Sequence, residues 1–479
     1  MTRLAGALRA LGVDDGDRVA VLARNSDRYH ESVLATWWAG GVVVPLNTRW
    51  SAAEVAFALG DAEPDVLVVD DALLPLLGAG EAVPGGVTVV HAGDGAAPPG
   101  TLDYEELVEG HEPVADAVRR GQDIAGIFYT GGTTGRPKGV MLSHANLVIS
   151  TLGIQATVRG IHPGGRLLLF NPLFHAGGFG CWNYQNTFGG TQVILPGFEP
   201  LEALRAIERH RVTLMWIVPT MIQALLDHPE RGKYDLSSIR HIQYGASPIS
   251  PTLLRRALEA FPGSRFAQGY GMTELSPAAT MLTPEDHEDE SRLDSVGRPV
   301  PFTELKVVDP DDAEVPRGQV GEIICRGGQV MLGYWRRPEE AAAALRGGWM
   351  HTGDAGYLDK DGYVHVVDRI KDMIVSGGEN VYSAEVENAL VQHPAVGSCA
   401  VIGVPDDTYG ERVHAVVVLT PGHTVTAEEL RAHCKTLIAG YKSPRSAEFV
   451  ASLPLSGAGK ILKRELRAPH WSGRGRSVH

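Results

Sequence analysis

Short runs of β-branched and aliphatic residues alternate with stretches of helical periodicity over most of this chain, and this alternation constrains its fold more than any other feature. The clearest cases are helical stretches followed by strand-like runs, at residues 4–11 and 18–22, 29–39 and 41–45, and 201–209 and 212–218. Consecutive parallel strands need a crossover connection, usually a helix. The pattern therefore predicts an α/β architecture of mostly parallel sheets sandwiched by helices.

The pattern changes near residues 368–372, where helices and strands begin to alternate over shorter distances. A helix, two strands and a second helix are expected at residues 384–392, 400–404, 414–419 and 427–437. The span after the change is an ordinary size for a domain. We expect a large N-terminal domain over 1–369, with an antiparallel, β-barrel-like section near 305–325, and a small α+β domain over 370–479.

The balance of acidic and basic residues bears on which classes of binding partner are expected. Lys and Arg total 43 against 57 Asp and Glu, which gives a net charge of -14. A nucleic-acid-binding protein usually shows a basic face, so nucleic acid is not an expected partner. No run of about 18 apolar residues occurs, and the first residues lack the apolar core of a signal peptide, so neither a membrane span nor export is expected.

The four cysteines are widely separated, at positions 181, 325, 399 and 434. No CxxC pair and no Cys/His spacing typical of zinc ligands occurs, which argues against a structural zinc site. Scattered thiols fit the reducing cytoplasm, where we expect the protein to work.

The glycine-rich segment 129–139, YTGGTTGRPKG, follows a strand-like run and is the most informative part of the chain. Glycines let backbone N–H groups approach an anion closely, and the threonine hydroxyls and Lys138 add donors and positive charge. Pro137 precedes the lysine and Gly139 follows it, so this is not a Walker A loop. From composition alone, a phosphate-binding loop and a surface turn are about equally good interpretations.

Resemblance decides between them, because TGGTTGRPKG is similar to the phosphate loop of the acyl-adenylate-forming (ANL) superfamily. That superfamily includes acyl-CoA synthetases, luciferases and peptide-synthetase adenylation domains. Further motifs that resemble the family's follow in the family's order: YGMTE at 270–274, GEI at 321–323, GYW at 333–335, HTGD at 351–354, DRIKD at 368–372, SGGEN at 376–380 and GAGK at 457–460. Family members normally carry some tens of residues before the first helix of this chain. We therefore expect either a missing edge element or a misassigned start.

The resemblance implies a two-step reaction that uses ATP, Mg²⁺ and coenzyme A. A carboxylate first attacks the α-phosphorus of ATP to give acyl-AMP and pyrophosphate, and a thiol then accepts the acyl group. The implied phosphate-binding residues are Thr130, Gly131, Gly132, Thr133, Thr134, Gly135 and Lys138. Thr273 would contact the α-phosphate, Glu274 would be the Mg²⁺ ligand, and Lys460 would bridge the attacking carboxylate and the α-phosphate.

The nucleoside site is implied by resemblance as well. Asp354 would accept both ribose hydroxyls and Arg369 would add a contact on the ribose side, although an isolated Thr-Gly-Asp is a common turn. Adenine would lie near Gly245, Ala246, Ser247, Gln268, Gly269, Tyr270 and Gly271, with the Tyr270 ring as a stacking face.

Two further features implied by the family concern the second half-reaction. Lys371 matches the position of the hinge about which the family's small domain rotates. Gly377 and Gly378 would line the tunnel for the pantetheine arm, because only glycine permits such a close approach.

The segment 171–179, NPLFHAGGF, resembles the family's substrate wall. His175 is expected either to gate the carboxylate or to pack in the core. The other candidate lining residues are equally compatible with plain core positions: Phe179, Trp182, Trp216, Met221, Tyr244 and Met272. The wall lacks the aspartate with which the family's peptide-synthetase domains bind the α-ammonium group of an amino acid. A fatty or aryl acid is therefore expected, in an apolar pocket.

Other readings stay open at this point. The acyl group could pass to a carrier-protein thiol, an amine or another small nucleophile. A nucleotide-binding protein without catalysis, or a luciferase-type oxygenase, would show similar motifs, although Glu274, Asp354, Arg369 and Lys460 together favour catalysis. A small-molecule acid is the expected partner, with an acyl carrier protein as a further candidate, and a monomer or homodimer is the expected state.

Overall fold

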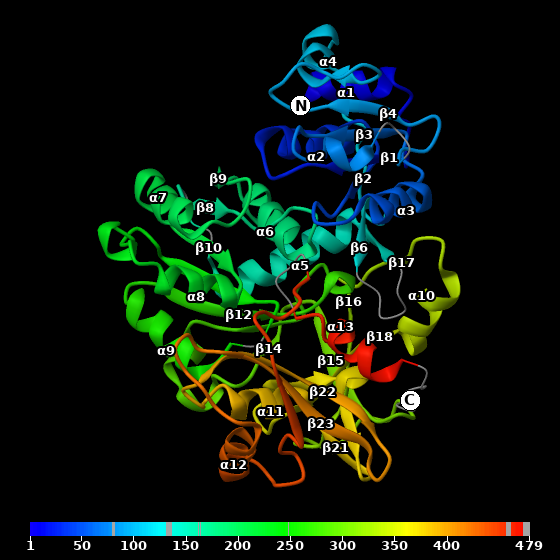
Figure 1. Ribbon diagram of the computed structural model, residues 1–479. Helices are drawn as coiled ribbons and strands as arrows, with labels where there is room; N and C mark the ends of the chain where they lie inside the picture. The colour runs from blue at the N-terminus through cyan, green and yellow to red at the C-terminus, as the bar shows by residue number, and fades with distance from the viewer. Residues whose placement is uncertain are drawn as a thin grey trace.

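The structure is a computed structural model that describes residues 1–78, 82–130, 137–160, 162, 164–247, 249–456 and 461–472. Figure 1 shows a tall body built from the N-terminal three quarters of the chain, with the C-terminal segment packed beneath it. The expected α/β fold class is confirmed by four separate sheets and the helices that cover them.

Eight strands form the first sheet, in the order β17-β7-β6-β2-β1-β3-β4-β5. Their bounds are β1 Arg18–Leu22, β2 Val42–Pro45, β3 Val66–Val69, β4 Thr88–His91, β5 Leu102–Asp103, β6 Ile124–Thr130, β7 Lys138–Ser143 and β17 Gly333–Tyr334. The pairs from β6 through β2, β1, β3 and β4 to β5 are parallel, whereas β7 pairs antiparallel with both β6 and β17.

The second sheet has seven strands in the order β14-β13-β12-β11-β10-β8-β9. Its strands are β8 Arg166–Leu169, β9 Thr191–Ile194, β10 Leu214–Ile217, β11 His241–Gly245, β12 Arg265–Tyr270, β13 Thr280–Leu282 and β14 Arg298–Pro299. The pairs from β9 to β12 are parallel, and β13 and β14 continue the sheet antiparallel.

Helices fill three layers around these two sheets. The large shared core lies between the sheets, where Trp37 of α2, Phe128 of β6 and Phe179 and Trp182 of α6 meet edge to face or tilted. The helices of this half are α1 Thr2–Ala10, α2 Asp27–Trp38, α3 Ala52–Ala62, α4 Tyr104–Gly110, α5 His144–Val158, α6 Ala176–Thr187, α7 Pro200–His210, α8 Pro219–Asp227 and α9 Pro251–Ala260. Helix α3 covers the outer face of the first sheet, and α7, α8 and α9 cover that of the second.

Local sequence explains where several of these helices begin. Ser51 opens α3 and Ser143 opens α5, each in a capping box that satisfies backbone N–H groups at the first turn. Proline stands in the first turn of α7, α8 and α9, where its missing N–H costs no helical hydrogen bond.

A third, antiparallel sheet has the order β15-β16-β18-β19 and lies where an antiparallel section was expected, near Leu305. Its end strands β15 and β19 do not pair with each other among the described strands, so the sheet is open, in contrast to the expected barrel-like form. Its bounds are β15 Thr303–Val308, β16 Gly321–Gly327, β18 Met350–Leu358 and β19 Val364–Arg369, with α10 Pro338–Ala344 inserted before β18. The last strand runs directly into the short turn η7, Ile370–Asp372.

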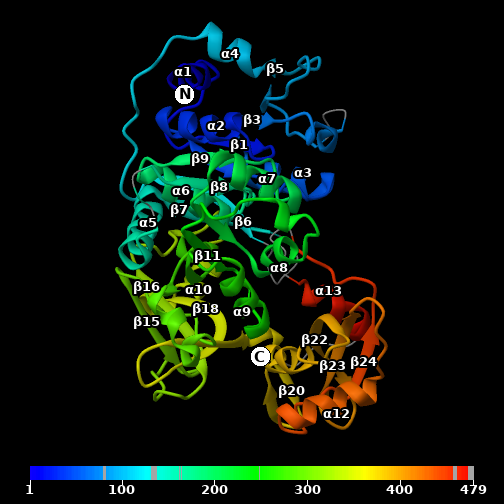
Figure 2. The ribbon, with the colours of Figure 1, turned by 90° about the vertical axis from the view of Figure 1, so that its left-hand side faces the viewer.

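The C-terminal segment has its own five-stranded sheet, in which β21, β20, β23 and β22 lie in order and β24 pairs with β23. The elements are β20 Ile374–Ser376, β21 Glu379–Val381, α11 Ser383–Leu390, β22 Val396–Asp406, β23 Gly410–Leu419, α12 Ala427–Leu437, β24 Ser446–Phe449, α13 Lys463–Arg467 and η8 Ala468–Trp471. Figure 2 shows this segment to one side below the larger body, with α13 on the side that faces α8. Among the described residues, no helix is long and apolar enough to cross a membrane.

Candidate functional site

The two ends of the glycine-rich segment stand opposite each other in an antiparallel hairpin. Thr130 closes β6 and pairs with Lys138, the first residue of β7. The predicted phosphate ligands Gly131, Gly132, Thr133, Thr134 and Gly135 lie outside the described residues. The hairpin register therefore places Thr130 and Lys138 opposite each other in the first sheet, where β6 ends and β7 begins.

Lys138 is held by two neighbours that the sequence did not point to. Its ammonium forms an ion pair with Glu340 of α10 and lies 5.1 Å from the centroid of the Tyr334 ring. Tyr334 in turn donates a 2.9 Å hydrogen bond to Oε1 of Glu274. One tyrosine thus contacts both the phosphate-side lysine and the expected Mg²⁺ ligand.

Glu274 is a buried carboxylate in the short helix η3, Thr273–Leu275, and is 6% exposed. Its backbone carbonyl accepts a hydrogen bond from the N–H of Met331, which fixes the turn against β17. Burial raises the pKa of Glu274, while the Tyr334 hydroxyl and the charges of Arg369 and Lys138 oppose the rise. A buried anionic ligand surrounded by cations suits a site for a metal–phosphate complex.

Asp354 is the centre of the nucleoside-side cluster. It pairs with Arg369 across the antiparallel strands β18 and β19, and Arg369 Nε lies 2.6 Å from Asp354 Oδ1. Tyr270 donates a 2.7 Å hydrogen bond from its hydroxyl to Oδ2 of the same carboxylate. The structure therefore joins three predicted residues from two different sheets, with Asp354 buried at 4% exposure.

The residues predicted around adenine lie at the carboxyl ends of β11 and β12, where a parallel sheet commonly binds ligands. The register pairs Gly245 with Gly269 and Tyr244 with Gln268, and Ala246 and Ser247 continue directly beyond β11. A Cβ on Gly245 would lie 2.1 Å from the Gly269 carbonyl oxygen, so the strands approach too closely for any side chain there. Gly271 is equally confined, by the Pro277 carbonyl oxygen at 2.0 Å.

The predicted wall residues divide into two groups. Phe179 and Trp182 are fully buried in α6, and the Trp182 ring N–H donates a 2.8 Å hydrogen bond to Nδ1 of His30. These two side chains are part of the core behind the wall. His175 is the N-cap of α6, half-buried, with its ring 4.3 Å from that of Phe174.

The remaining wall candidates sit nearer the strand ends. Trp216 and Met272 are half-buried, and Met221 lines a pocket together with Phe170, Phe174 and Phe198. Tyr244 is buried, and its hydroxyl lies 3.0 Å from Nε2 of His287. Among the predicted wall residues, Met221 therefore lies in a pocket that is lined partly by aromatic side chains.

The same pocket reaches a basic rim formed by Arg24 and Arg49. Arg49 donates a 3.4 Å hydrogen bond to the backbone carbonyl of Ser456, the last described residue before 457–460. Lys460 itself lies outside the described residues. Its neighbour Ser456 places this end of the C-terminal segment against the large body.

The predicted hinge residue Lys371 lies in η7, between the third sheet and the C-terminal sheet. Its backbone carbonyl accepts a 3.1 Å hydrogen bond from Arg467 of α13, whose guanidinium also forms a 2.6 Å ion pair with Asp372. Gly377 and Gly378 form the turn between β20 and β21 at φ +64° and +84°, a left-handed conformation that favours glycine.

A second group of contacts near the hinge involves buried charge. The hydroxyl of Ser383 donates a 2.7 Å hydrogen bond to Asp368, and the ammonium of Lys463 donates to Ser383 and lies 2.8 Å from Glu387. Sequence reasoning did not single out Tyr334, Glu340, Lys463 or Arg467. Tyr334 stands inside one of the family-like motifs, which was the one available signal.

Comparison with known proteins places this geometry in a family. A family model described as AMP-binding enzyme matches residues 1–335, and one described as AMP-binding enzyme C-terminal domain matches residues 385–460. A feruloyl-CoA synthase of an Amycolatopsis species is 42% identical over 471 residues, which cover 98% of this chain and 91% of that protein.

Two further comparisons bear on the acyl acceptor. The fatty acid–[acyl-carrier-protein] ligase ScoC of Streptomyces coeruleorubidus is 37% identical over 484 residues, covering 100% of this chain and 91% of ScoC. The solved structure of the amide bond synthetase McbA from Marinactinospora thermotolerans matches with a TM-score of 0.86 at 34% identity, covering 97% of this chain and 92% of McbA. Together the matches confirm the resemblance drawn from the motifs and the expected class, an AMP-forming acid–thiol ligase.

Proposed function

Because this chain belongs to the AMP-binding enzyme family, we propose that it joins an aryl or fatty carboxylic acid to AMP and then transfers the acyl group to coenzyme A. The observation that carries the proposal is the contact cluster in which Asp354 binds both Tyr270 and Arg369, with the buried Glu274 and its partner Tyr334 near Arg369 and Lys138.

The first half-reaction brings two anions together, so the site must neutralise charge and align the reactants. Thr130, Lys138 and the glycine-rich residues 131–135 hold the β- and γ-phosphates, and Lys138 exchanges Glu340 for phosphate as ATP binds. Thr273 contacts the α-phosphate. Lys460 offsets the negative charge that develops as the carboxylate oxygen bonds to the α-phosphorus.

Mg²⁺ fits the donor set, because Glu274 offers a buried carboxylate and the phosphates offer the remaining oxygen ligands. When bound there, the ion neutralises phosphate charge. Tyr334 orients the carboxylate by its hydrogen bond to Oε1.

Nucleoside recognition follows from the cluster around Asp354. Its carboxylate is already held by Tyr270 and Arg369, so it is oriented before the ribose hydroxyls bind. The adenine ring lies against residues 245–247 and 268–271, where glycine permits a close approach.

The acid pocket is formed by His175, Trp216, Met221 and Met272, with Phe179 and Trp182 packed behind them. An apolar wall with a single histidine favours an aromatic or fatty acid over an amino acid. The 42% identity to a feruloyl-CoA synthase supports the aryl class.

The second half-reaction is assigned to the small domain, residues 370–479, which turns about Lys371 after adenylate formation. Gly377 and Gly378 then border the path of the pantetheine arm. The arginines of the pocket rim, Arg24 and Arg49, suit the phosphates of coenzyme A. We place this chemistry in the cytoplasm, with a monomer or homodimer as the working form.

The experiment that tests this function screens aryl and fatty acids by pyrophosphate release, and then adds coenzyme A to the best acid and identifies the acyl-CoA by mass. The Lys460→Ala variant should lose adenylation yet still convert supplied acyl-AMP to the thioester. A variant that adenylates at the wild-type rate would remove Lys460 from this role.

Two similar proteins favour other acceptors of the acyl group than coenzyme A. ScoC is named as a carrier-protein ligase, and McbA is named as an amide bond synthetase. Parallel reactions with coenzyme A, a phosphopantetheinylated carrier protein and a simple amine distinguish them. Acid-dependent ATP–pyrophosphate exchange without any acyl transfer to coenzyme A would favour these acceptors, and no exchange at all would indicate a nucleotide-binding protein without catalysis.

A further inference from the structure

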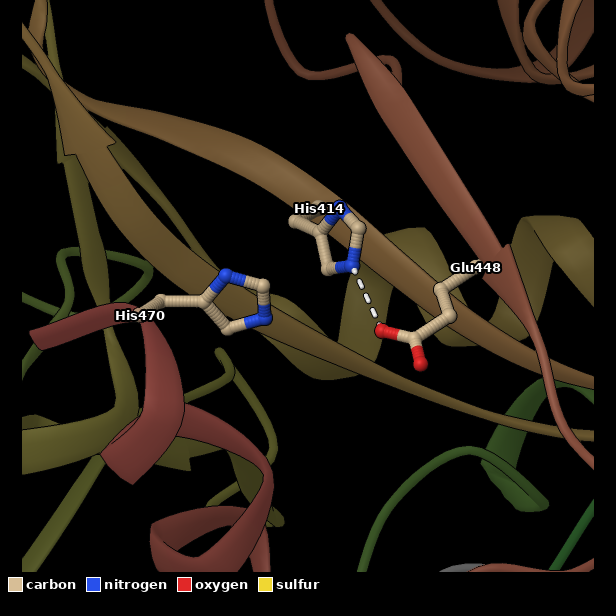
Figure 3. A group of neighbouring side chains, drawn as sticks. All are labelled: His414, Glu448 and His470. Atoms are coloured by element: carbon tan, nitrogen blue, oxygen red, sulfur yellow. Dashed lines mark ion pairs between the residues drawn. The ribbon is translucent and has the colours of Figure 1, made fainter.

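Three potential metal ligands meet on one face of the C-terminal sheet, away from the nucleotide residues. They are His414 of β23, Glu448 of β24 and His470 of η8, and their ligand atoms all lie within 4.8 Å of one another. Figure 3 shows the two histidine rings and the carboxylate gathered from these three elements. The linear spacing of the cysteines and histidines gave no sign of the group, because its members are 34 and 22 residues apart.

Strand register explains why they meet. The parallel pairing of β23 with β24 sets His414 opposite Ser446 and Val416 opposite Glu448. Side chains alternate along a strand, so these four lie on the same face of the sheet. Trp471 fixes η8 over this face with a 2.9 Å hydrogen bond from its ring N–H to the carbonyl of Gly403 in β22.

The buried imidazole of His414 is the observation that points to a ligand. Its side chain is 8% exposed, and its Nε2 has no hydrogen-bond partner among the described residues, since the Glu448 carboxylate oxygen stands 3.8 Å away. A buried polar atom without a partner is costly. The other ring nitrogen, Nδ1, lies 2.7 Å from the Ser446 hydroxyl, so the ring is oriented with Nε2 towards Glu448.

This arrangement has the features of a protein metal site. A metal-binding histidine commonly holds the metal with one ring nitrogen and forms a hydrogen bond with the other, which fixes the orientation of the ring. A tetrahedral Zn²⁺ with ligands at about 2.1 Å sets neighbouring ligand atoms about 3.4 Å apart. The 3.8 Å separation of His414 and Glu448 is close to that value, and both Glu448 and His470 are exposed and able to adjust.

We propose that His414, Glu448 and His470 bind one divalent transition-metal ion of the Zn²⁺ type in the small domain, with water at the fourth position. Two imidazoles and one carboxylate select such an ion over Mg²⁺ or Ca²⁺, which prefer oxygen ligands alone. The bound ion would tie η8, and through it α13, to strands β23 and β24.

The test titrates tag-free, chelator-treated full-length protein with Zn²⁺ by calorimetry and with Co²⁺ by visible absorption. We expect one ion per chain, cobalt bands typical of imidazole coordination, and a higher melting temperature with Zn²⁺. Glu448→Gln and His470→Gln should each weaken Zn²⁺ binding at least as much as Ser446→Ala, for which a loss of about 10- to 100-fold is expected.

The matched control is His423→Gln, which removes an exposed histidine of the same domain outside the group and should leave affinity unchanged. Glu448 and His470 are exposed, so their variants should fold, and unchanged melting temperature without metal will verify this. The proposal is overturned if the wild type binds no Zn²⁺, or if Glu448→Gln and His470→Gln bind it as tightly as the wild type. The Zn²⁺ affinity and the melting temperature are both measured independently of adenylation.

Discussion

Lys138 stands at the phosphate side of the site with its charge already paired to Glu340. That ion pair lowers the pKa of Glu340, chiefly through the hydrogen bond with Lys138, and Arg337 adds to the effect. In the proposed function ATP displaces this carboxylate when Lys138 binds a phosphate. We therefore propose that Glu340 competes with the nucleotide for Lys138.

Glu340→Gln should therefore lower the KM for ATP by about two- to fivefold, the range that corresponds to a partly exposed ion pair. The measurement is the ATP dependence of acid-stimulated pyrophosphate exchange. Glu339→Gln, an exposed neighbour in the same helix, serves as the control. An equal change in both variants would mean that general surface charge is responsible.

Asp354→Asn should raise the KM for ATP by about 10- to 100-fold, because charged hydrogen bonds to the ribose are replaced by weaker ones. The test compares ATP with its 2′-deoxy and 3′-deoxy analogues in wild type and variant. Wild type should discriminate against at least one analogue, and the variant should discriminate far less. If the variant keeps the full preference for ATP, Asp354 does not contact the ribose.

At the level of elements, the strand-like and helical runs of the sequence fell close to real strands and helices. The runs expected at 18–22 and 427–437 coincide with β1 and α12, and the expected helix at 201–209 lies within α7. The periodicity of apolar residues indicates which face of an element is buried. These elements could be predicted because each is buried on one face or on two. β22 is longer than the expected run at 400–404, because its two ends also pair with β23, at polar positions such as Ser398 and Asp406 as well as at Val396.

The candidate site could be predicted from the sequence only in part. Motif order singled out Glu274, Asp354 and Arg369, but some of their contacts join residues that are far apart in the sequence, as with Tyr334 and Glu274, 60 residues apart. Phe179 and Trp182 were candidates for the pocket wall and lie in the core. Helix α6 is buried on nearly all sides, so an aromatic residue in it gives the same sequence pattern in the core and in a pocket wall, and only packing distinguishes the two.

The proposed hinge at Lys371 is the element-level feature with the clearest consequence. Arg467 of α13 binds both the carbonyl of Lys371 and the side chain of Asp372, so α13 is attached to the proposed hinge. We expect a rotation at Lys371 to move α13 together with the C-terminal sheet.

Lys371→Pro should leave acyl-AMP formation near the wild-type rate and slow thioester formation strongly, because proline restricts the backbone rotation at that position. Both steps are measured separately, by pyrophosphate release and by acyl-CoA formation from supplied acyl-AMP. Lys360→Pro is the control, since it lies in the turn between β18 and β19 at a position that tolerates proline. Equal loss of both steps in Lys371→Pro would refute the hinge.

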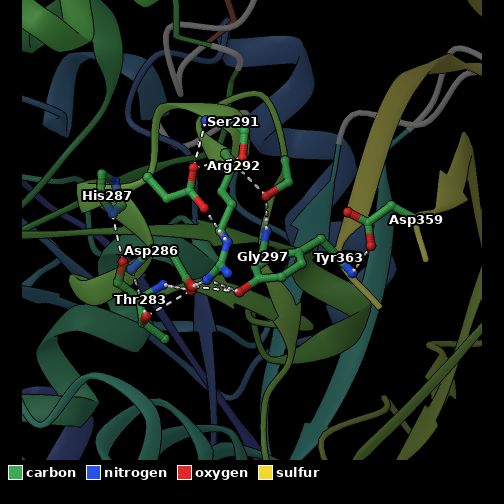
Figure 4. A network of polar contacts seen from close by, with 10 residues as sticks. Thr283, Asp286, His287, Ser291, Arg292, Gly297, Asp359 and Tyr363 are labelled. Atoms are coloured by element: carbon green, nitrogen blue, oxygen red, sulfur yellow. Dashed lines mark hydrogen bonds and ion pairs between the residues drawn. The ribbon is translucent and has the colours of Figure 1, made fainter. Parts of the chain in front are cut away.

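Across the whole molecule, a polar network joins the second sheet to the third. Figure 4 shows Asp286 accepting hydrogen bonds from Tyr363, Thr283 and Arg292, with Tyr363 at 2.6 Å and Arg292 at 2.9 Å. Burial raises the pKa of Asp286, but these hydrogen bonds outweigh it and leave the pKa below its ordinary value. The stabilisation is therefore complete above about pH 3.9 and is lost as the pH falls through the lower folded pKa.

Asp286→Asn should lower the thermal midpoint at pH 7, by an amount corresponding to about 1–3 kcal/mol. The difference between wild type and variant should shrink as the pH is lowered below about 3.9, because the unfolded chain then binds a proton at Asp286 and the folded protein binds it only at lower pH. Thermal melts from pH 7 to pH 3 follow this, with the exposed Asp294→Asn as control. A difference that stays constant over this range would exclude a role for the ionised carboxylate.

The central claim is that a carboxylate oxygen bonds to the α-phosphorus of ATP in this site. A preferred acid labelled with ¹⁸O in both carboxylate positions, incubated with ATP and coenzyme A, tests it most directly by the mass of the products. One ¹⁸O atom is expected in the AMP phosphate and one in the acyl-CoA carbonyl. AMP without label, or label in pyrophosphate or phosphate, would contradict it.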